Sequence, residues 1–142
     1  EKNLIIIGGG AAGLFSAIGA LKKGIKPVIV EKMPRLGTKI LITGKGRCNL
    51  TNASDDMEFF VKNMPGNGSF LYSAFYTFTN QDTIELFHSL GLQTKVERGG
   101  RVFPVTDRAK DVVNVLEKFI RKKGVKILLN TPVKELIIEK IL

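Results

Sequence analysis

Apolar and polar positions follow one another along this chain in an order that predicts strands and helices in alternation. Uninterrupted apolar runs predict strands over residues 4–8 and 27–31, and such runs are typical of strands buried in a parallel sheet. Between them, an apolar stripe with helical spacing predicts a helix over residues 11–23, which Gly24 should end. Strand, helix and strand in about 30 residues make one βαβ unit.

The pattern changes after the second strand. Residues 31–52 lack a regular period and form a loop rich in glycine and lysine, and long loops in compact domains are usually functional. Short helices and strands are predicted next, which indicates an inserted α+β segment. The helices are expected over 55–62, 69–78 and 81–90, and the strands over 93–97 and 101–105.

Helix and strand alternate again near the end of the chain. Thr106 is expected to cap a helix over residues 107–123, which Gly124 should end, and strands are predicted over 125–129 and 133–141. The apolar face of this helix is expected to comprise Val112, Val115, Leu116 and Phe119.

Glycines stand where the first predicted strand meets the first predicted helix. The sequence Gly8-Gly9-Gly10-Ala11-Ala12-Gly13 satisfies the G-x-G-x-x-G pattern of dinucleotide-binding turns. Gly8 would permit the tight turn, Gly10 would let a pyrophosphate reach backbone N–H groups at the helix N-terminus, and Gly13 would let the helix pack close to the sheet.

An acidic residue completes this fingerprint. Glu31 ends the second predicted strand, where a carboxylate accepts hydrogen bonds from a ribose. NAD, NADP and FAD all bind such a unit, although a carboxylate here disfavours the 2′-phosphate of NADP. An NAD-dependent dehydrogenase domain and a nucleotide- or RNA-binding module without catalysis are therefore alternatives to a flavoprotein.

The fingerprint predicts a Rossmann-like, doubly wound α/β domain. We divide the chain into a βαβ unit over residues 1–52, an α+β insertion over 53–106 and a helix-strand return over 107–142. Because the chain stops within a predicted strand, we expect these 142 residues to be the N-terminal portion of a longer enzyme and to be inactive alone.

Composition and charge narrow the function classes. The 142 residues are 44% hydrophobic and include one cysteine, with no secretory signal or membrane-length apolar run, so we expect a cytoplasmic protein without a membrane partner. The net charge of +9 invites a nucleic-acid reading. The basic residues are scattered, however, and their densest cluster, over 118–123, suits a helix C-terminus, so no nucleic-acid partner is expected.

Several sequence blocks resemble one family. Besides the glycine turn and Glu31-Lys32, the blocks are Gly37-Thr38-Lys39-Ile40-Leu41-Ile42, Gly44-Lys45-Gly46-Arg47-Cys48-Asn49-Leu50-Thr51-Asn52, Gly100-Arg101-Val102-Phe103-Pro104-Val105 and Thr131-Pro132-Val133. Together they are similar to BaiN/YhiN-type flavoproteins, the aminoacetone-oxidase-like NAD(P)/FAD-dependent oxidoreductases, over essentially the whole chain. Lys45 departs from the family pattern, which commonly has glycine there.

The resemblance implies FAD as cofactor of an oxidoreductase, with NAD(P)H as a possible electron donor and a small molecule as substrate. It places the FAD pyrophosphate on Gly8, Gly10, Ala11, Ala12 and Gly13, and the adenosine ribose on Glu31 and Lys32. It also places Lys39, Gly44, Arg47, Cys48 and Asn49 along the cofactor, and the Val133 backbone at the adenine edge. No catalytic residue and no metal ligand is assigned.

Other residues have two interpretations. Cys48, beside Arg47, is either a reactive thiol or a small residue packed in a turn, and we favour the packed residue. The only histidine, His88, is expected to be non-catalytic. The spacing of Leu71, Phe75 and Phe78 favours helix core packing over cofactor stacking. Residues 101–104 either lie near the substrate side, which we favour, or form a strand that enters the cap of the next helix.

Overall fold

The computed structural model describes residues 4–138, and the chain divides into two compact units. One unit contains residues 1–40 and 116–142, and the other contains residues 41–115. The glycine- and lysine-rich loop from residue 41 onward therefore belongs with the α+β segment and not with the first βαβ unit. None of the helices described over residues 4–138 is long and apolar enough to cross a lipid bilayer.

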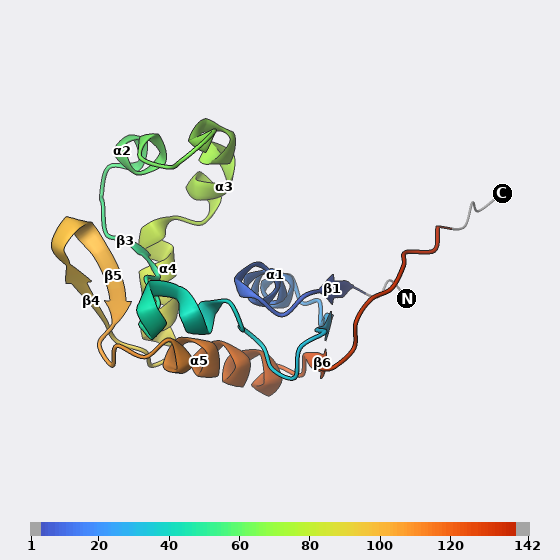
Figure 1. Cartoon of the computed structure of the whole chain (residues 1–142). Helices are drawn as coiled ribbons and strands as arrows, with labels where there is room; N and C mark the ends of the chain where they lie inside the picture. The colour runs from blue at the N-terminus through green and yellow to red at the C-terminus, as the bar shows by residue number, and fades with distance from the viewer. Residues whose placement is uncertain (1–3, 139–142) are drawn as a thin grey trace. The chain divides into compact units, whose positions relative to one another are not determined.

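The first unit is built on a three-stranded parallel sheet with the order β1-β2-β6 (Figure 1). The strands are β1 (Ile5–Ile7), β2 (Val28–Val30) and β6 (Lys126–Leu128). Each lies inside its predicted range. Helix α1 (Ala11–Lys22) follows β1 directly and contacts it. The expected Rossmann-like βαβ arrangement is confirmed.

Helix α1 ends as its sequence predicts. Gly24 has φ +74°, and the N–H of Ile25 donates to the Ala20 carbonyl at 3.0 Å while the N–H of Gly24 donates to Leu21. These two bonds form a Schellman motif, which satisfies carbonyls at the helix end. On the helix face toward the core, Leu14 and Ala17 are fully buried.

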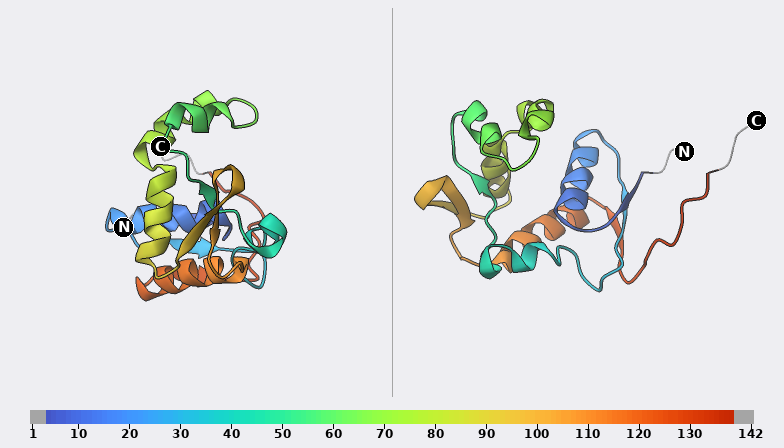
Figure 2. Two further views of the ribbon diagram at one scale, coloured as in Figure 1. Left: turned by 90° about the vertical axis from the view of Figure 1, so that its left-hand side faces the viewer. Right: turned by 45° about the horizontal axis from the view of Figure 1, so that its top comes forward.

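The second unit contains an antiparallel sheet with the order β3-β5-β4 (Figure 2). Its strands are β3 (Thr51–Asn52), β4 (Thr94–Glu97) and β5 (Arg101–Pro104), and α4 (Asn80–Ser89) contacts β3 and β4. A capping box starts α4, since Thr79 accepts from the Asp82 N–H and Asp82 accepts from the Thr79 N–H. The inserted α+β segment is confirmed.

Short helical elements complete the second unit: η1 (Ile40–Gly46), α2 (Met57–Lys62), η2 (Gly68–Leu71), α3 (Tyr72–Thr77) and η3 (Arg98–Gly100). The helix predicted over 69–78 is divided into η2 and α3. Its expected core packing is wrong, because no residue of α3 is buried and Leu71 is exposed. Phe75 instead meets Phe60 edge to face at 5.2 Å between ring centroids.

The last helix, α5 (Ala109–Lys122), begins two residues later than predicted. Asp107 has φ +54°, which lies outside the right-handed helical region, so Thr106 does not cap the helix. The expected apolar face is also partly wrong. The buried residues of α5 are Ala109, Val112, Val113, Leu116 and Ile120, whereas Val115 and Phe119 are half-buried.

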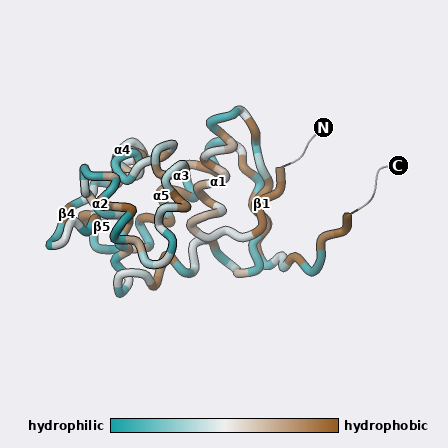
Figure 3. The backbone as a smooth tube through the Cα atoms, turned by 90° about the horizontal axis from the view of Figure 1, so that it is seen from above, coloured by the Kyte–Doolittle hydropathy of each residue, from teal (hydrophilic) through white to brown (hydrophobic). Residues whose placement is uncertain are grey.

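The strand predicted over 133–141 is absent from its described part. Residues 133–138 have no secondary structure, and residues 139–141 lie outside the described residues. Leu136, Ile137 and Ile138 are exposed, at 74%, 78% and 90%, and Figure 3 shows this stretch in its apolar colour. A strand exists only where a neighbouring strand accepts its hydrogen bonds, and apolar sequence alone does not supply that neighbour.

Candidate functional site

The glycine turn joins β1 to the N-terminus of α1. Gly8 has φ +98°, and its N–H donates to the Val30 carbonyl at 2.8 Å, so the turn is tied to the end of β2. Gly10 is the N-cap residue of α1, without a side-chain cap, and the first helical turn contains no acidic residue. The positive end of the helix dipole and its first N–H groups are therefore left for an anion.

A side chain would be tolerated differently at each of three glycines of the turn. A Cβ on Gly13 would lie 1.9 Å from the Gly8 carbonyl oxygen, and a Cβ on Gly9 would lie 2.2 Å from the Leu36 side chain. A Cβ on Gly10 would meet nothing within 4 Å. Gly13 thus allows close packing of α1, while Gly10 borders open space, as the fingerprint predicts. The packing role of Gly9 was not predicted, because Leu36 lies far from it in the sequence.

Glu31 lies directly beside this turn. The residue is buried, with 9% of its surface exposed, and its Oε2 atom accepts a hydrogen bond from the Gly9 N–H at 2.6 Å. Its Oε1 atom accepts from the Met33 N–H at 2.8 Å. A carboxylate offers about four lone-pair sites, so two backbone bonds leave further sites for a ribose hydroxyl. The acid predicted to bind a ribose also fixes the turn itself.

The segment after Glu31 returns to the turn. The Gly37 N–H donates to the Gly9 carbonyl at 2.8 Å, and Leu36 is 1% exposed beneath it. The Oγ1 atom of Thr38 is buried and has no hydrogen-bond partner among the described residues. The side chains of Lys32 and Lys39, both assigned to the cofactor by resemblance, are exposed. The segment that returns to the turn therefore carries two exposed lysines and the unpartnered hydroxyl of Thr38.

The residues after β6 are anchored to the same region. The N–H of Asn130 donates to the Met33 carbonyl at 3.2 Å, and the N–H of Thr131 donates to the Glu31 carbonyl at 2.9 Å. Val133, assigned to the adenine edge, follows two residues later and is exposed at 43%. The first unit thus brings the glycine turn, Glu31 and the segment before Val133 together.

The loop in the second unit has a left-handed backbone. Thr43 is extended, and Gly44, Lys45, Gly46 and Cys48 all have positive φ, at 54°, 57°, 84° and 63°. Such a conformation is unfavourable for Lys45 and Cys48 because their Cβ atoms crowd the backbone. The Cys48 N–H closes the turn by donating to the Thr43 carbonyl at 3.1 Å.

Arg47 points its guanidinium at two carboxylates of the same unit. Its Nε and Nη2 atoms donate to Asp107 Oδ1 at 2.9 and 2.7 Å, and Nη2 also donates to Glu97. Lys95 donates to Asp107 Oδ2 at 2.5 Å and lies 3.6 Å from Glu97. The guanidinium carbon stands 4.1 Å from the centroid of the Phe103 ring, a cation–π geometry.

These contacts lower the pKa values of both carboxyl groups, Glu97 and Asp107. The hydrogen bond from Arg47 holds the pKa of the Glu97 carboxyl below its ordinary value. The hydrogen bond from Lys95, with that from Arg47, does the same to the pKa of Asp107. Both carboxylates therefore stay ionised beside the two cations at neutral pH. No sequence signal pairs Arg47 with acids that lie 50 and 60 positions away.

Cys48 and Asn49, also assigned to the cofactor, lie in this loop. Cys48 is 6% exposed, and burial raises the pKa of its thiol, as expected of a packed residue. With its amide oriented to satisfy its neighbours, Asn49 donates to the Thr51 and Val102 carbonyls at 2.9 and 3.2 Å. The loop is thereby joined to β3 and β5.

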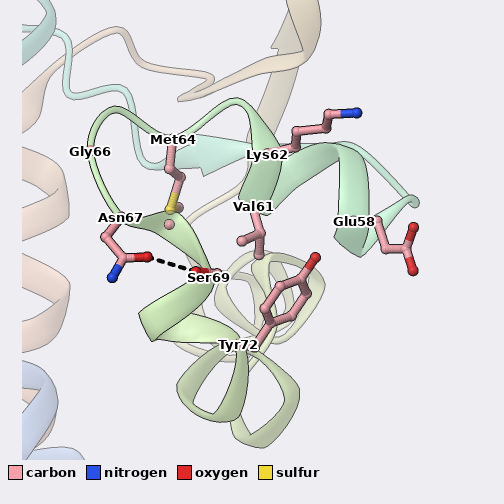
Figure 4. A pocket seen from close by; sticks show the side chains of 9 residues that line it. Glu58, Val61, Lys62, Met64, Gly66, Asn67, Ser69 and Tyr72 are labelled. Atoms are coloured by element: carbon pink, nitrogen blue, oxygen red, sulfur yellow. Dashed lines mark hydrogen bonds between the residues drawn. The ribbon is translucent and has the colours of Figure 1, made fainter.

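The remaining candidates lie elsewhere in the second unit. His88 Nε2 is hydrogen-bonded to Thr94 Oγ1 at 2.8 Å, which links α4 to β4. Residues 102–104, within the block assigned to the substrate side, are buried in β5. A pocket of about 300 Å³ lies beside α2 and η2. Figure 4 shows the ring of Tyr72 extending toward Val61 in its lining. None of its lining residues belongs to the predicted site.

The first unit meets the requirements of a dinucleotide pyrophosphate. The open space at Gly10, the uncapped N-terminus of α1 and the carboxylate of Glu31 are the three features that the fold uses to hold pyrophosphate and ribose. They derive from separate stretches of sequence and converge at the C-terminal ends of β1 and β2, where ligands bind in open α/β sheets.

Comparison with known proteins agrees with this fold. The chain is 41% identical to a 3-dehydro-bile acid delta(4,6)-reductase of Clostridium scindens over 124 residues, which are 86% of this chain and 29% of that protein. It is 34% identical to a ribosomal RNA dihydrouridine synthase of Haemophilus influenzae over 92% of this chain and 32% of that protein. The chain therefore spans about a third of the length of these curated relatives.

A solved structure shares the fold. The structure of the open conformation of a flavocytochrome c3 fumarate reductase matches 97% of this chain and 28% of its own, with a TM-score of 0.74 at 20% identity. The family profile described as "HI0933-like protein Rossmann domain" matches residues 2–141. The chain therefore belongs to the HI0933-like family, which confirms its resemblance to the BaiN/YhiN-type flavoproteins and its Rossmann-like fold.

Proposed function

We propose that this chain is the FAD-binding segment of a flavin-dependent oxidoreductase. The observation that carries the proposal is the pairing of open space at Gly10 with the carboxylate of Glu31, which accepts from Gly9 in the same turn. Pyrophosphate would lie over Gly10 at the N-terminus of α1, and ribose hydroxyls would donate to Glu31. Family membership favours FAD over NAD as the dinucleotide.

The other proposed contacts follow the family resemblance. Gly8, Ala11, Ala12 and Gly13 would complete the pyrophosphate turn, Lys32 would accompany Glu31 at the ribose, and the Val133 backbone would meet the adenine edge. Lys39, Gly44, Cys48 and Asn49 would contact the cofactor farther along. Lys39 and Lys45 form no ion pair within residues 4–138, so their charges are available to an anion.

We further propose the class of reaction. The names of two relatives, a delta(4,6)-reductase and a dihydrouridine synthase, both denote the saturation of a carbon–carbon double bond. Bound FAD would supply the two-electron hydride chemistry for such a step. The substrate would be a small molecule with a double bond conjugated to a carbonyl, and NAD(P)H would be the electron donor. An RNA uridine is the second candidate substrate, because two relatives at 34% identity are named for it.

The cofactor can be tested directly. The protein as encoded by its gene is purified, its visible absorption is recorded, and the released ligand is identified by mass. We expect a flavin spectrum and the mass of FAD. A colourless protein that is stabilised by NAD, or one that binds RNA in a salt-sensitive way without flavin, would instead support the alternatives.

The reaction can be tested with NAD(P)H and two acceptors. One acceptor is a 3-oxo steroid with conjugated double bonds at positions 4 and 6, and the other is a uridine-containing ribosomal RNA transcript. We expect oxidation of NAD(P)H only with the steroid. Turnover with the RNA and not with the steroid would identify the RNA as the substrate. If neither acceptor supports the oxidation of NAD(P)H, the result would contradict the proposed reaction class.

A further inference from the structure

Two non-glycine residues of the turn from Thr43 to Cys48 have an unfavourable left-handed backbone conformation. Lys45 and Cys48 are in the left-handed region, and non-glycine residues there cost about 1–2 kcal/mol each. Such conformations persist only where the surrounding structure fixes them. Two backbone hydrogen bonds lie within the turn, from the Cys48 N–H to the Thr43 carbonyl and from the Arg47 N–H to the Gly44 carbonyl, and the remaining contacts that fix it come from the neighbouring strands.

Three connections join the turn to the neighbouring strands. The Leu50 N–H donates to the Val102 carbonyl at 2.8 Å, and Asn49 donates to the carbonyls of Thr51 and Val102. The third connection is the Arg47 side chain, which donates three hydrogen bonds, one to Glu97 at the end of β4 and two to Asp107 after β5. Only Arg47 lies within the turn itself, so it restrains the turn most directly.

The surroundings of Arg47 are unsuited to a phosphate. The formal charges of Arg47, Lys95, Glu97 and Asp107 sum to zero, and a phosphate approaching the guanidinium would meet two carboxylates. One face of the guanidinium is occupied by the Phe103 ring. Displacing either acid from Arg47 would break its hydrogen bond to the guanidinium and leave Lys95 as its remaining cationic partner.

We propose that Arg47 is a positioning residue and not a ligand of the cofactor: its guanidinium, held by Glu97 and Asp107 over the Phe103 ring, fixes the left-handed turn from Gly44 to Cys48. The inference rests on the proposed function in one respect, namely that this turn contacts FAD. The restraint on the turn is independent of that function. A direct ligand and a positioning residue then differ in how they respond to loss of the acids.

The experiment removes each partner in turn from the protein as encoded by its gene. R47A, E97Q and D107N are compared with wild type by FAD titration of the apoprotein and by hydrogen exchange of amides 44–48 without FAD. Asparagine tolerates the left-handed backbone of position 107, so D107N adds no strain. E117Q is the matched control, because it breaks the Arg121–Glu117 ion pair on α5.

If Arg47 positions the turn, all three variants weaken FAD binding by roughly fivefold to tenfold. Amides 44–48 then exchange about tenfold faster in all three. The R47A/E97Q double variant is no weaker than R47A, and R47K recovers part of the affinity. E117Q behaves as wild type in both measurements.

Two outcomes contradict the inference. If E97Q and D107N bind FAD as tightly as wild type, or more tightly, while R47A binds it weakly, Arg47 is a ligand whose acids merely compete for it. If the exchange of amides 44–48 is unchanged in all variants, Arg47 does not fix the turn. A wild-type protein that takes up no FAD while its variants show faster exchange contradicts the proposed function and leaves the restraint supported.

Discussion

The Oε2 atom of Glu31 accepts a hydrogen bond from the Gly9 N–H at 2.6 Å, so the acid at the end of β2 is joined to the glycine turn after β1. Its Oε1 atom accepts from Met33. The two halves of the dinucleotide fingerprint are therefore coupled before any ligand binds. Pre-organisation of this kind reduces the ordering that binding would otherwise require.

This coupling predicts the effect of Glu31→Gln on stability. An amide keeps the size of the side chain but offers one oxygen acceptor in place of two, so either the buried Gly9 N–H or the partly buried Met33 N–H loses its partner. We expect the free energy of unfolding to fall by about 1–3 kcal/mol. Urea unfolding measures it, and a variant as stable as wild type would show that these hydrogen bonds contribute little.

The sequence predicts β1, α1 and β2 of the first unit well because their signals are local. The apolar runs of β1 and β2, the spacing along α1 and the glycine after it each lie within a few residues of the structure that they determine. The fingerprint likewise predicts close packing at Gly13, where a Cβ would lie 1.9 Å from the Gly8 carbonyl oxygen, and open space at Gly10, where a Cβ would meet nothing within 4 Å.

The errors occur where distant residues decide the outcome. The start of α5 depends on Asp107, whose left-handed backbone accompanies ion pairs with Arg47 and Lys95. The apolar run over 133–138 has strand-forming residues but no strand beside it among the described residues. The ion pairs of Arg47 with Glu97 and Asp107 are likewise absent from the sequence prediction, because these acids lie 50 and 60 positions away.

Lys45→Gly is expected to stabilise the protein. Lys45 has φ +57° and ψ +40°, a conformation that glycine adopts without steric cost. Glycine loses more conformational entropy on folding than lysine does, which offsets part of the relieved strain. We therefore expect the free energy of unfolding to rise by about 0.5–1 kcal/mol. Thermal unfolding measures it.

The control for this variant is Lys118→Gly. Lys118 is exposed within α5, where glycine is unfavourable, so the same substitution should destabilise the protein by about 1 kcal/mol. If Lys45→Gly also destabilises, the left-handed backbone at position 45 is not a source of strain.

The lowered pKa values of Glu97 and Asp107 predict how the stability of the second unit depends on pH. A carboxyl whose folded-state pKa is below its unfolded value stabilises the fold above the unfolded pKa and loses that effect as pH falls through the folded one. Wild type should therefore be more stable than the E97Q/D107N variant at pH 7, and the difference should shrink as pH falls below about 4. Urea unfolding of both proteins from pH 7 to 2.5 tests this. If the difference in the free energy of unfolding grows as the pH falls, the two carboxylates do not stabilise the fold in the expected way.

Gly10→Ala and Gly13→Ala form a matched pair that separates ligand binding from folding. The added methyl at position 10 meets nothing within 4 Å, so stability should change by less than about 0.5 kcal/mol. The methyl at position 13 would lie 1.9 Å from the Gly8 carbonyl oxygen and 3.3 Å from the Ile6 side chain, so α1 must move and stability should fall by about 1–3 kcal/mol.

For the affinity toward FAD we expect the opposite order, with Gly10→Ala impaired more than Gly13→Ala. The methyl on Gly10 fills the space where the pyrophosphate would approach the N-terminus of α1, so Gly10→Ala should bind FAD at least about tenfold more weakly while unfolding like wild type. Titration with FAD and urea unfolding of both variants give the comparison. Wild-type affinity in Gly10→Ala would mean that the open space at Gly10 does not receive the pyrophosphate. The glycine turn would then serve the packing of α1 against β1 alone, which Gly13 already explains.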